Sequence, residues 1–274
     1  MKRSPLALAL VNGALIGLAA VSLAPLFWML AVSFMQPGEA SHFPPPWWPS
    51  HPTLHNYREL FLRNGMATYL FNSALIATGV TLISVLLNTL AGYAFAKLRF
   101  RGRERTFRAL LAALVIPAQV AMMPLFLLLK QMGLVNTYFG AMVPGLAGIF
   151  GIFLVRQYAR SLPDELLEAA RIDGASEARI FFQVVLPALR PILVTLAVFA
   201  FLGAWNDFMW PLIVLGDQDM QTLPVALATL SREHVQDNEL MMAGAVVTIV
   251  PVLMLFLMLQ RYYLQGLLVG SVKG

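Results

Sequence analysis

The sequence predicts an all-α membrane protein with six transmembrane helices. Of its 274 residues, 59% are apolar and only 12% are Asp, Glu, Lys or Arg, whereas a soluble domain carries about 25% charged residues. Six apolar stretches are separable, and each is close to or above the roughly 20 residues that a membrane-crossing helix needs. They cover about residues 6–35, 68–96, 107–130, 138–155, 191–215 and 241–260. We expect residues 1–274 to form a single transmembrane domain.

The first apolar stretch follows Lys2 and Arg3, as the core of a signal peptide would. It stays apolar as far as Phe34, well beyond the roughly 7–15 residues of a cleaved signal. We therefore expect an uncleaved membrane anchor.

The basic residues predict how the chain is oriented. Only four of the 19 basic residues lie on one side of the predicted helices: Arg58, Arg63, Lys130 and Arg232. The other 15 basic residues lie on the opposite side, which includes both termini. Because loops rich in Lys and Arg remain in the cytoplasm, this side is predicted to be cytoplasmic. The net charge of +5 is thus explained by topology, and nucleic acid is not an expected partner. The run from Lys97 to Arg108 is interpreted as a topology anchor, with contact to anionic membrane lipid as the alternative.

The two largest predicted outer loops differ in composition. Residues 36–67 contain a Pro- and Trp-rich run that stops a helix, followed by apolar residues at helical spacing that indicate a short surface helix. Residues 216–240 are acidic. They are interpreted as a solvated surface, with a docking face as the alternative.

Residues 156–190, on the cytoplasmic side, predict a helix, a glycine turn and a second helix. Pro163 and Asp164 are typical of a helix start, and Gly174 is typical of a helix end, where the left-handed conformation is often needed. Ser176 is expected to cap the second helix. The first helix has an apolar stripe made of Leu166, Leu167, Ala169, Ala170 and Ile172. Small residues beside a carboxylate suit close docking on a partner; packing on lipid headgroups or on the bundle is the alternative.

The same segment carries a family resemblance. Glu168-Ala169-Ala170-Arg171-Ile172-Asp173-Gly174-Ala175, followed by Leu186-Pro187 and Pro191, resembles the EAA motif of inner-membrane permease subunits in ABC importers. Other stretches resemble the carbohydrate branch of that family, in the subunit type that pairs with a longer partner permease. They are Asn72-Ser73, the residues 91–97, Trp205-Asn206-Asp207-Phe208 with Trp210-Pro211, and the C-terminal residues 260–274.

The resemblance implies a heteromeric importer in the inner membrane of a bacterial or archaeal cell. Two permease subunits would form the pathway as a heterodimer, two cytoplasmic ATPase subunits would drive it, and an extracytoplasmic solute-binding protein would deliver the cargo. Carried over to this sequence, the residues that dock on the ATPase, within a coupling helix at about 164–175, are Glu168, Ala169, Ala170, Asp173 and Gly174. A sugar is the implied cargo, with glycerol-phosphate or a polyol as the alternative.

The chain lacks the phosphate-binding sequence G-x-x-x-x-G-K-[ST]. We therefore expect ATP and Mg to bind to the partner ATPase subunits, and no cofactor on this chain.

Polar residues inside the spans are candidates for the pathway or its gate. Ser73, Thr81, Ser84 and Asn88 recur at spacings that place them on one face of a helix. They could line a pathway for hydroxyl-rich cargo or pack neighbouring helices. Asn206 and Asp207 lie near the outer end of the fifth span, and could face the pathway or cap and anchor that span.

Two other classes of protein fit the sequence less well. An intramembrane enzyme is disfavoured because all four histidines, His42, His51, His55 and His234, fall in outer loops and the chain has no cysteine. We accordingly expect no catalytic residue and no metal site. A stand-alone secondary transporter or channel usually has ionisable residues near the middle of the bilayer, and none is evident here.

Overall fold

A computed structural model describes residues 5–233 and 237–269. Every secondary-structure element within these ranges is helical, which confirms the all-α fold class. Lys2, Arg3, His234 and residues 270–274, which contributed to the predictions of an anchor, of orientation and of family, lie outside the described residues. Contacts divide the chain into two compact units, Met1–Ala67 with Ala226–Pro251 and Thr68–Val225 with Val252–Gly274.

The first unit is built on two long helices. It contains α1 (Pro5–Ser33), the short helices η1 (Glu39–Ser41) and α2 (His55–Leu62), most of α13 (Leu223–Glu233) and the first part of α14 (Asn238–Val269). Helix α2 is attached to the end of α1 and to the loop that follows it, because the Asn56 side chain donates to the carbonyls of Ser33 and Met35 at 3.0 and 2.9 Å. The short helix expected in residues 36–67 is α2.

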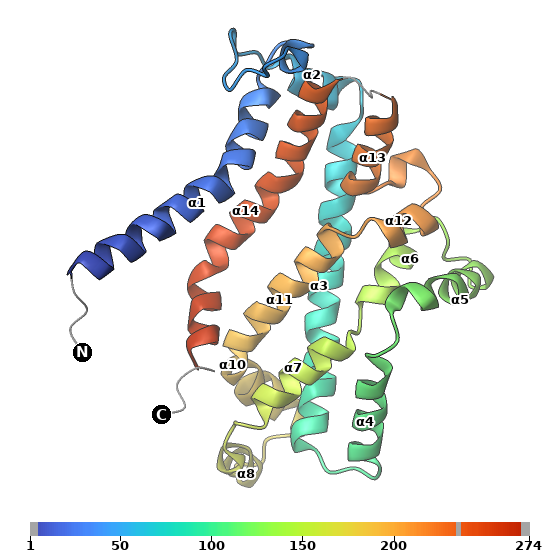
Figure 1. The fold of residues 1–274 in the computed structure, drawn as a ribbon. Helices are drawn as coiled ribbons and strands as arrows, with labels where there is room; N and C mark the ends of the chain where they lie inside the picture. Colours follow the sequence, from blue (N-terminus) through green and yellow to red (C-terminus); the bar gives the residue numbers. More distant parts are fainter. Residues whose placement is uncertain (1–4, 234–236, 270–274) are drawn as a thin grey trace. The chain divides into compact units, whose positions relative to one another are not determined.

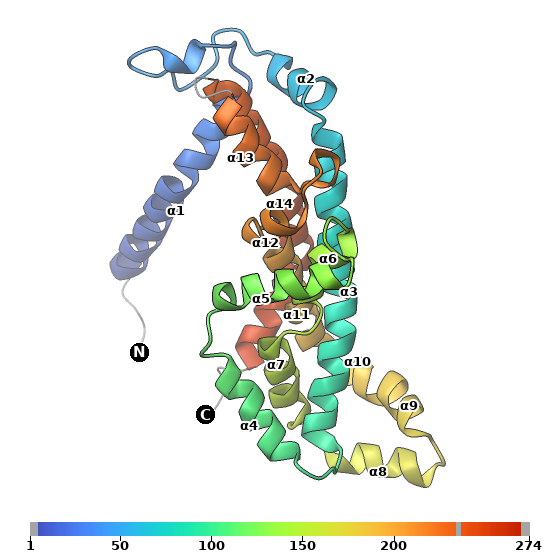
Figure 2. The same ribbon diagram turned by 90° about the vertical axis from the view of Figure 1, so that its right-hand side faces the viewer.

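The second unit is organised around α3 (Met66–Lys97) (Figures 1 and 2). The elements that follow α3 in this unit are α4 (Arg103–Ala113), α5 (Ala118–Gln131), α6 (Tyr138–Met142), η2 (Val143–Gly145), α7 (Ile149–Ala159), α8 (Asp164–Ile172), α9 (Glu177–Ile180), η3 (Phe181–Val185), α10 (Leu186–Ala188), α11 (Arg190–Trp205), α12 (Met209–Val214) and η4 (Gln218–Met220).

Three described helices are long and apolar enough to cross a membrane, and the number rises to six if each of three bent helix pairs is one span. The long helices are Leu8–Ser33, Met66–Lys97 and Asn238–Gln260. The bent pairs are α4 with α5 at 103°, Tyr138–Gly145 with α7 at 47°, and Glu177–Ala188 with α11 at 81°.

The bends are where the structure differs from the predicted continuous spans. The predicted span 107–130 is two helices, because Pro117 has no backbone N–H and disfavours the α conformation of the residue before it. The predicted span 191–215 is broken after Trp205. In a continuous helix the ring of Pro211 would clash with the carbonyl of Asp207, so a new helix begins at Met209.

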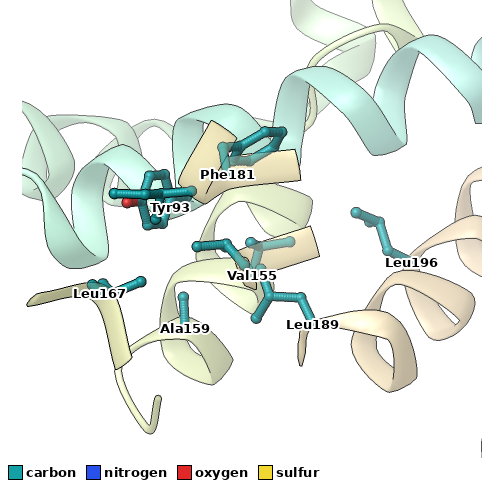
Figure 3. Close-up of a cluster of buried hydrophobic side chains, with 9 residues drawn as sticks. Tyr93, Val155, Ala159, Leu167, Phe181, Leu189 and Leu196 are labelled. Atoms are coloured by element: carbon teal, nitrogen blue, oxygen red, sulfur yellow. The ribbon is translucent and has the colours of Figure 1, made fainter. Parts of the chain in front are cut away.

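The main core of the second unit joins α3, α7, α8 and the segment from α9 to α11. Its buried residues are Tyr93, Val155, Ala159, Leu167, Ile180, Phe181, Val185, Leu189 and Leu196 (Figure 3). Gly92 allows α3 and α7 to approach closely, because a Cβ atom on it would lie 2.6 Å from the Cβ of Val155. This core positions the segment between α7 and α11.

Candidate functional site

Helix α8 begins and ends where the sequence predicts. Pro163 precedes it, and Asp164 and Glu165 occupy its first turn, where carboxylates interact favourably with the helix dipole. At its end Gly174 has a φ of 79°, a left-handed conformation that costs a glycine little. The N–H of Ala175 donates to the carbonyl of Ala170 at 3.0 Å. The turn therefore closes α8 sharply and directs the chain into α9.

The second short helix is also capped as expected. The Ser176 hydroxyl accepts a hydrogen bond from the N–H of Arg179 at 3.3 Å. Helix α9 then continues through η3 and α10, and α11 starts with Pro191 in its first turn. Local sequence signals therefore suffice to place both helices of the segment.

One side of α8 is held by the core. Leu167 is only 3% exposed and lies in the cluster with Ala159 and Tyr93 (Figure 3), and Ala170 packs beside it. Burial of one leucine side chain contributes roughly 1.5–3 kcal/mol. Leu167 is thus the main apolar attachment of α8 to the rest of the unit.

Polar contacts fix both ends of α8. At its start, Lys97 Nζ donates to the Leu162 carbonyl and to Asp164 Oδ1, each at 2.6 Å. The Lys97 ammonium lowers the pKa of the Asp164 carboxyl. At its end, Arg171 Nε donates to Glu177 Oε1 at 2.7 Å, and this contact raises the pKa of Arg171. Lys97 is the last residue of α3, so α8 is attached directly to that long helix (Figure 2).

The opposite side of α8 is exposed and partly apolar. Leu166 is 51% exposed and Ile172 is 86% exposed, and Glu168, Ala169 and Asp173 are exposed beside them. The predicted apolar stripe is therefore divided, with Leu167 and Ala170 facing inward and the others facing outward. We call Leu166, Glu168, Ala169, Ile172 and Asp173 the outer face of α8. Large apolar side chains grouped on an exposed surface are typical of an interaction site.

The polar residues of α3 make structural hydrogen bonds. Ser73 Oγ accepts from the N–H of Leu223 at 2.7 Å, and Thr81 donates to the carbonyl of Ala77 at 2.6 Å. Asn88 donates to Ser84 Oγ at 2.7 Å and accepts from the N–H of Gly148 at 3.0 Å. Ser73 and Asn88 thus bond α3 to other parts of the unit, whereas the bonds of Thr81 and Ser84 lie within α3.

Two of them also line a cavity. A cavity of about 350 Å³ lies among α3, α7 and α11, and its lining includes Ser84, Asn88 and Asp207 together with the rings of Phe150 and Phe199. Neither Ser73 nor Thr81 is part of this lining. The cavity combines a hydroxyl, an amide and a carboxylate with aromatic surface, a mixture suited to a polar organic solute.

Asp207 and Asn206 have different positions in the break between α11 and α12. Asp207 Oδ1 accepts from the N–H of Trp210 at 3.3 Å and so caps α12, while the residue also borders the cavity. Asn206 is exposed, and its side chain donates to the carbonyl of Leu202 at 2.9 Å, which closes the end of α11. Asp207 is therefore a cap of α12 that also borders the cavity, and its contact with a pathway stays a prediction.

The sequence did not indicate the contacts that hold α8. The sequence predicts no contact between Lys97 and another residue of the chain, and its partner Asp164 lies 67 residues further along. Arg171 and Glu177 are six residues apart on either side of the glycine turn, and helical spacing alone does not predict contacts across a turn. Among residues 5–233 and 237–269, no group of three or more His, Asp or Glu side chains is placed to hold a metal ion.

Several apolar helices long enough to cross a membrane, with an exposed amphipathic helix between two of them, define a multi-pass membrane protein. Residues 84–269 match the family described as "Binding-protein-dependent transport system inner membrane component". The chain belongs to this family. The match confirms the family that the EAA-like run suggested.

Named relatives are similar over most of their length. The arabinooligosaccharides transport system permease protein AraQ of Halalkalibacterium halodurans is 43% identical over 227 residues, which is 82% of this chain and 81% of that protein. The lactose transport system permease protein LacG of Rhizobium radiobacter is 36% identical over 218 residues, 80% of each chain.

Solved structures share the fold. A chain in the crystal structure of a bacterial ABC transporter involved in import of the acidic polysaccharide alginate superposes with a TM-score of 0.84 at 23% identity, covering 96% of this chain and 99% of that one. A chain from the alginate transporter in complex with alginate pentasaccharide-bound periplasmic protein gives a TM-score of 0.64 at 15% identity, with 93% and 94% coverage.

Proposed function

We propose that this chain is a permease subunit of an ATP-driven sugar importer, and that α8 transmits movement from the ATPase to the membrane helices. The observation that carries this proposal is the structure of α8. Its inner side is fixed by Leu167 and Lys97, while its outer face exposes Leu166 and Ile172 without a covering element in the described chain. A helix that is firmly attached on one side and apolar on the other is suited to dock on a partner protein.

In the proposed cycle a loaded binding protein docks on the outer loops while ATP draws two ATPase subunits together. The ATPase subunits bind ATP and Mg, and each holds the α8 helix of one permease subunit. Their closure displaces α8, and the Lys97 contact and the Leu167 core pass that displacement to α3, α7 and α11. Because a ligand shifts a conformational equilibrium only by its differential affinity for the two states, α8 must stay bound while the membrane helices change. The crowded basic side and both termini are cytoplasmic in this proposal.

A sugar is the favoured cargo. The named relatives transport arabino-oligosaccharides and lactose, which supports a hydroxyl-rich solute. In the cavity, the Asn88 amide can donate and accept hydrogen bonds, the Asp207 carboxylate can accept them, and Phe199 offers an aromatic face. A phosphate ester is disfavoured beside the Asp207 carboxylate, because like charges repel.

Reconstitution in liposomes tests whether this chain transports alone or only together with its partner subunits. We expect no ATP-dependent uptake by liposomes that contain this chain alone, and uptake when the second permease, the ATPase, the binding protein and ATP are added. Uptake by the chain alone would show a stand-alone transporter and refute the proposal.

A substitution on the outer face of α8 tests the docking role. Ile172→Asp replaces an exposed apolar group with a charge, so folding should be unaffected while docking is weakened. Burial of such a side chain contributes roughly 1.5–3 kcal/mol, so we expect the ATPase to bind at least tenfold more weakly in co-purification and uptake to fall in parallel. Ile172→Met keeps the apolar character and is the matched control. Normal ATPase binding by Ile172→Asp contradicts the assignment.

A further inference from the structure

The turn between α3 and α4 forms a basic hollow that the transport proposal does not use. Its volume is about 890 Å³, and it is lined by Arg99, Phe100, Arg101, Gly102, Arg103, Glu104, Arg105 and Arg108. Five arginines therefore surround one space with a single carboxylate among them. Water and salt screen the repulsion among these mostly exposed arginines, and an anion bound among them would offset it further.

The carboxylate does not neutralise the hollow, because it serves another residue. Glu104 Oε1 accepts from Arg156 Nη2 at 2.7 Å and lies 3.4 Å from Arg103 Nε. Arg156 is only 7% exposed, donates to the carbonyl of Phe95 at 3.1 Å, and its guanidinium lies 3.9 Å from the ring centre of Phe107. Glu104 thus fixes the turn against α7, which gives the hollow a defined backbone.

Three of the arginines can reach a ligand, and of these Arg108 also donates through Nε to the carbonyl of Glu104 at 3.3 Å. Arg101, Arg105 and Arg108 are exposed, and no Asp or Glu within residues 8–231 and 237–260 forms an ion pair with them. Arg105 and Arg108 are three residues apart on α4 and share a face. Guanidinium groups match the oxygens of a phosphate with two parallel hydrogen bonds, so this set is suited to a phosphate group.

The surface next to the hollow is apolar. Along α4 the arginines are followed by exposed Ala109 and Ala112, and the chain then exposes Leu114 and Val115, the latter 83% exposed. At 1.5 Å per residue, Leu114 lies about 9 Å beyond Arg108 along the helix direction. A free phosphate makes no contact with these exposed apolar residues, whereas the acyl chains of a phospholipid would cover them.

We propose that Arg101, Arg105 and Arg108 bind the phosphate of an anionic phospholipid whose acyl chains lie along α4. The site belongs to this chain alone and does not depend on the proposed cargo or on the ATPase. Each basic side chain near the membrane surface raises the affinity for anionic lipid headgroups about fivefold.

Native mass spectrometry of the full-length chain tests the site. The purified chain is titrated with phosphatidylglycerol, with phosphatidylcholine and with inorganic phosphate. We expect one phosphatidylglycerol to be retained in preference to phosphatidylcholine, and its binding constant to fall by roughly a hundredfold in the triple variant R101Q/R105Q/R108Q, at about fivefold for each charge. Inorganic phosphate should not displace the lipid at equal concentration. If phosphate binds as tightly as the lipid, the lipid assignment is overturned.

A second triple variant distinguishes a specific lipid site from general electrostatic attraction between the basic chain and anionic lipid. R160Q/R179Q/R190Q removes the same charge from exposed arginines elsewhere in the second unit and should leave phosphatidylglycerol binding within twofold of the parent. Equal losses in both triple variants, or none in either, refute the proposal. R101K/R105K/R108K keeps the charges that orient the chain in the membrane but loses the paired hydrogen bonds of the guanidinium groups, so its binding constant should lie between those of the parent chain and of the glutamine triple variant. Should the glutamine triple variant fail to insert, R105Q alone is expected to lower the binding constant about fivefold.

Discussion

At the scale of single residues, the decisive contacts of α8 are made by side chains that are distant in sequence. Gly174, Ser176 and Pro163 were predictable, because each acts on the backbone of its own segment. The Lys97 contact was not predictable. A lysine that ends an apolar span is explained by topology alone, and only the folded chain shows that its side chain is 7% exposed and bonded to α8.

The contact between Lys97 and Asp164 predicts a pH dependence of stability. Because Lys97 lowers the pKa of Asp164 in the folded chain, the carboxylate contributes stability above its ordinary pKa of about 3.9. This contribution is lost as the pH falls through the lowered folded pKa. We expect the apparent Tm of the parent chain to exceed that of Asp164→Asn slightly at pH 7, and the difference to vanish below the folded pKa.

The matched control removes the partner. In the Lys97→Met background the pH dependence of the same Asp164→Asn difference should be much smaller, since only the helix dipole and the weaker effects of Arg99 and Arg171 then favour the carboxylate. An undiminished pH-dependent difference without Lys97 would assign the lowered pKa to another group.

At the scale of elements, periodicity found α8 but could not orient it. Leu166 and Leu167 are adjacent and equally apolar, and a helix places neighbouring residues about 100° apart. Only one of them can face the core, and the core is formed by Tyr93, Ala159 and Phe181 from other segments. The division between an inner side and an outer face is therefore a tertiary property.

The prolines of the membrane helices also show that the sequence alone does not decide the tertiary structure. Pro117 lies at a break, whereas Pro25, Pro124 and Pro251 lie inside continuous helices. The sequence identifies where a helix is weakened, and the packing around each proline decides whether it breaks. Six apolar stretches could thus be predicted, while the bends of 103°, 47° and 81° could not.

The end of α8 provides a test at the element scale. No atom lies within 4 Å of a Cβ added to Gly174, so Gly174→Ala introduces no clash and only the strain of a positive φ. This strain costs roughly 1–2 kcal/mol. We expect amide hydrogen exchange in the peptide that covers residues 169–176 to accelerate about tenfold.

Gly174→Asn is the matched control, because asparagine adopts the left-handed conformation at a smaller cost. Its exchange should lie between that of the parent chain and that of Gly174→Ala. Equal exchange in all three chains would mean that the turn does not limit the stability of α8.

At the scale of the whole molecule, composition alone identified a membrane protein. The chain has too few charged residues to cover the surface of a soluble protein. The structure accordingly exposes many large apolar residues on α1, such as Ile16 and Val21. The family followed from one short run in the segment between α7 and α11. Neither composition nor that short run predicts the cavity, because residues of α3, α7 and α11, which are distant in sequence, form its lining.

Asp207 decides whether that cavity takes part in transport. Asp207→Asn removes the charge but keeps an oxygen that can accept the hydrogen bond from the N–H of Trp210, so the cap of α12 is preserved. If Asp207 contacts the solute, loss of a charged hydrogen-bond acceptor costs roughly 1.5–3 kcal/mol. We then expect the KM for uptake by the assembled transporter to rise at least tenfold, with unchanged co-purification of its subunits. If Asp207 serves only as a cap, Asp207→Asn transports normally and Asp207→Ala alone impairs assembly.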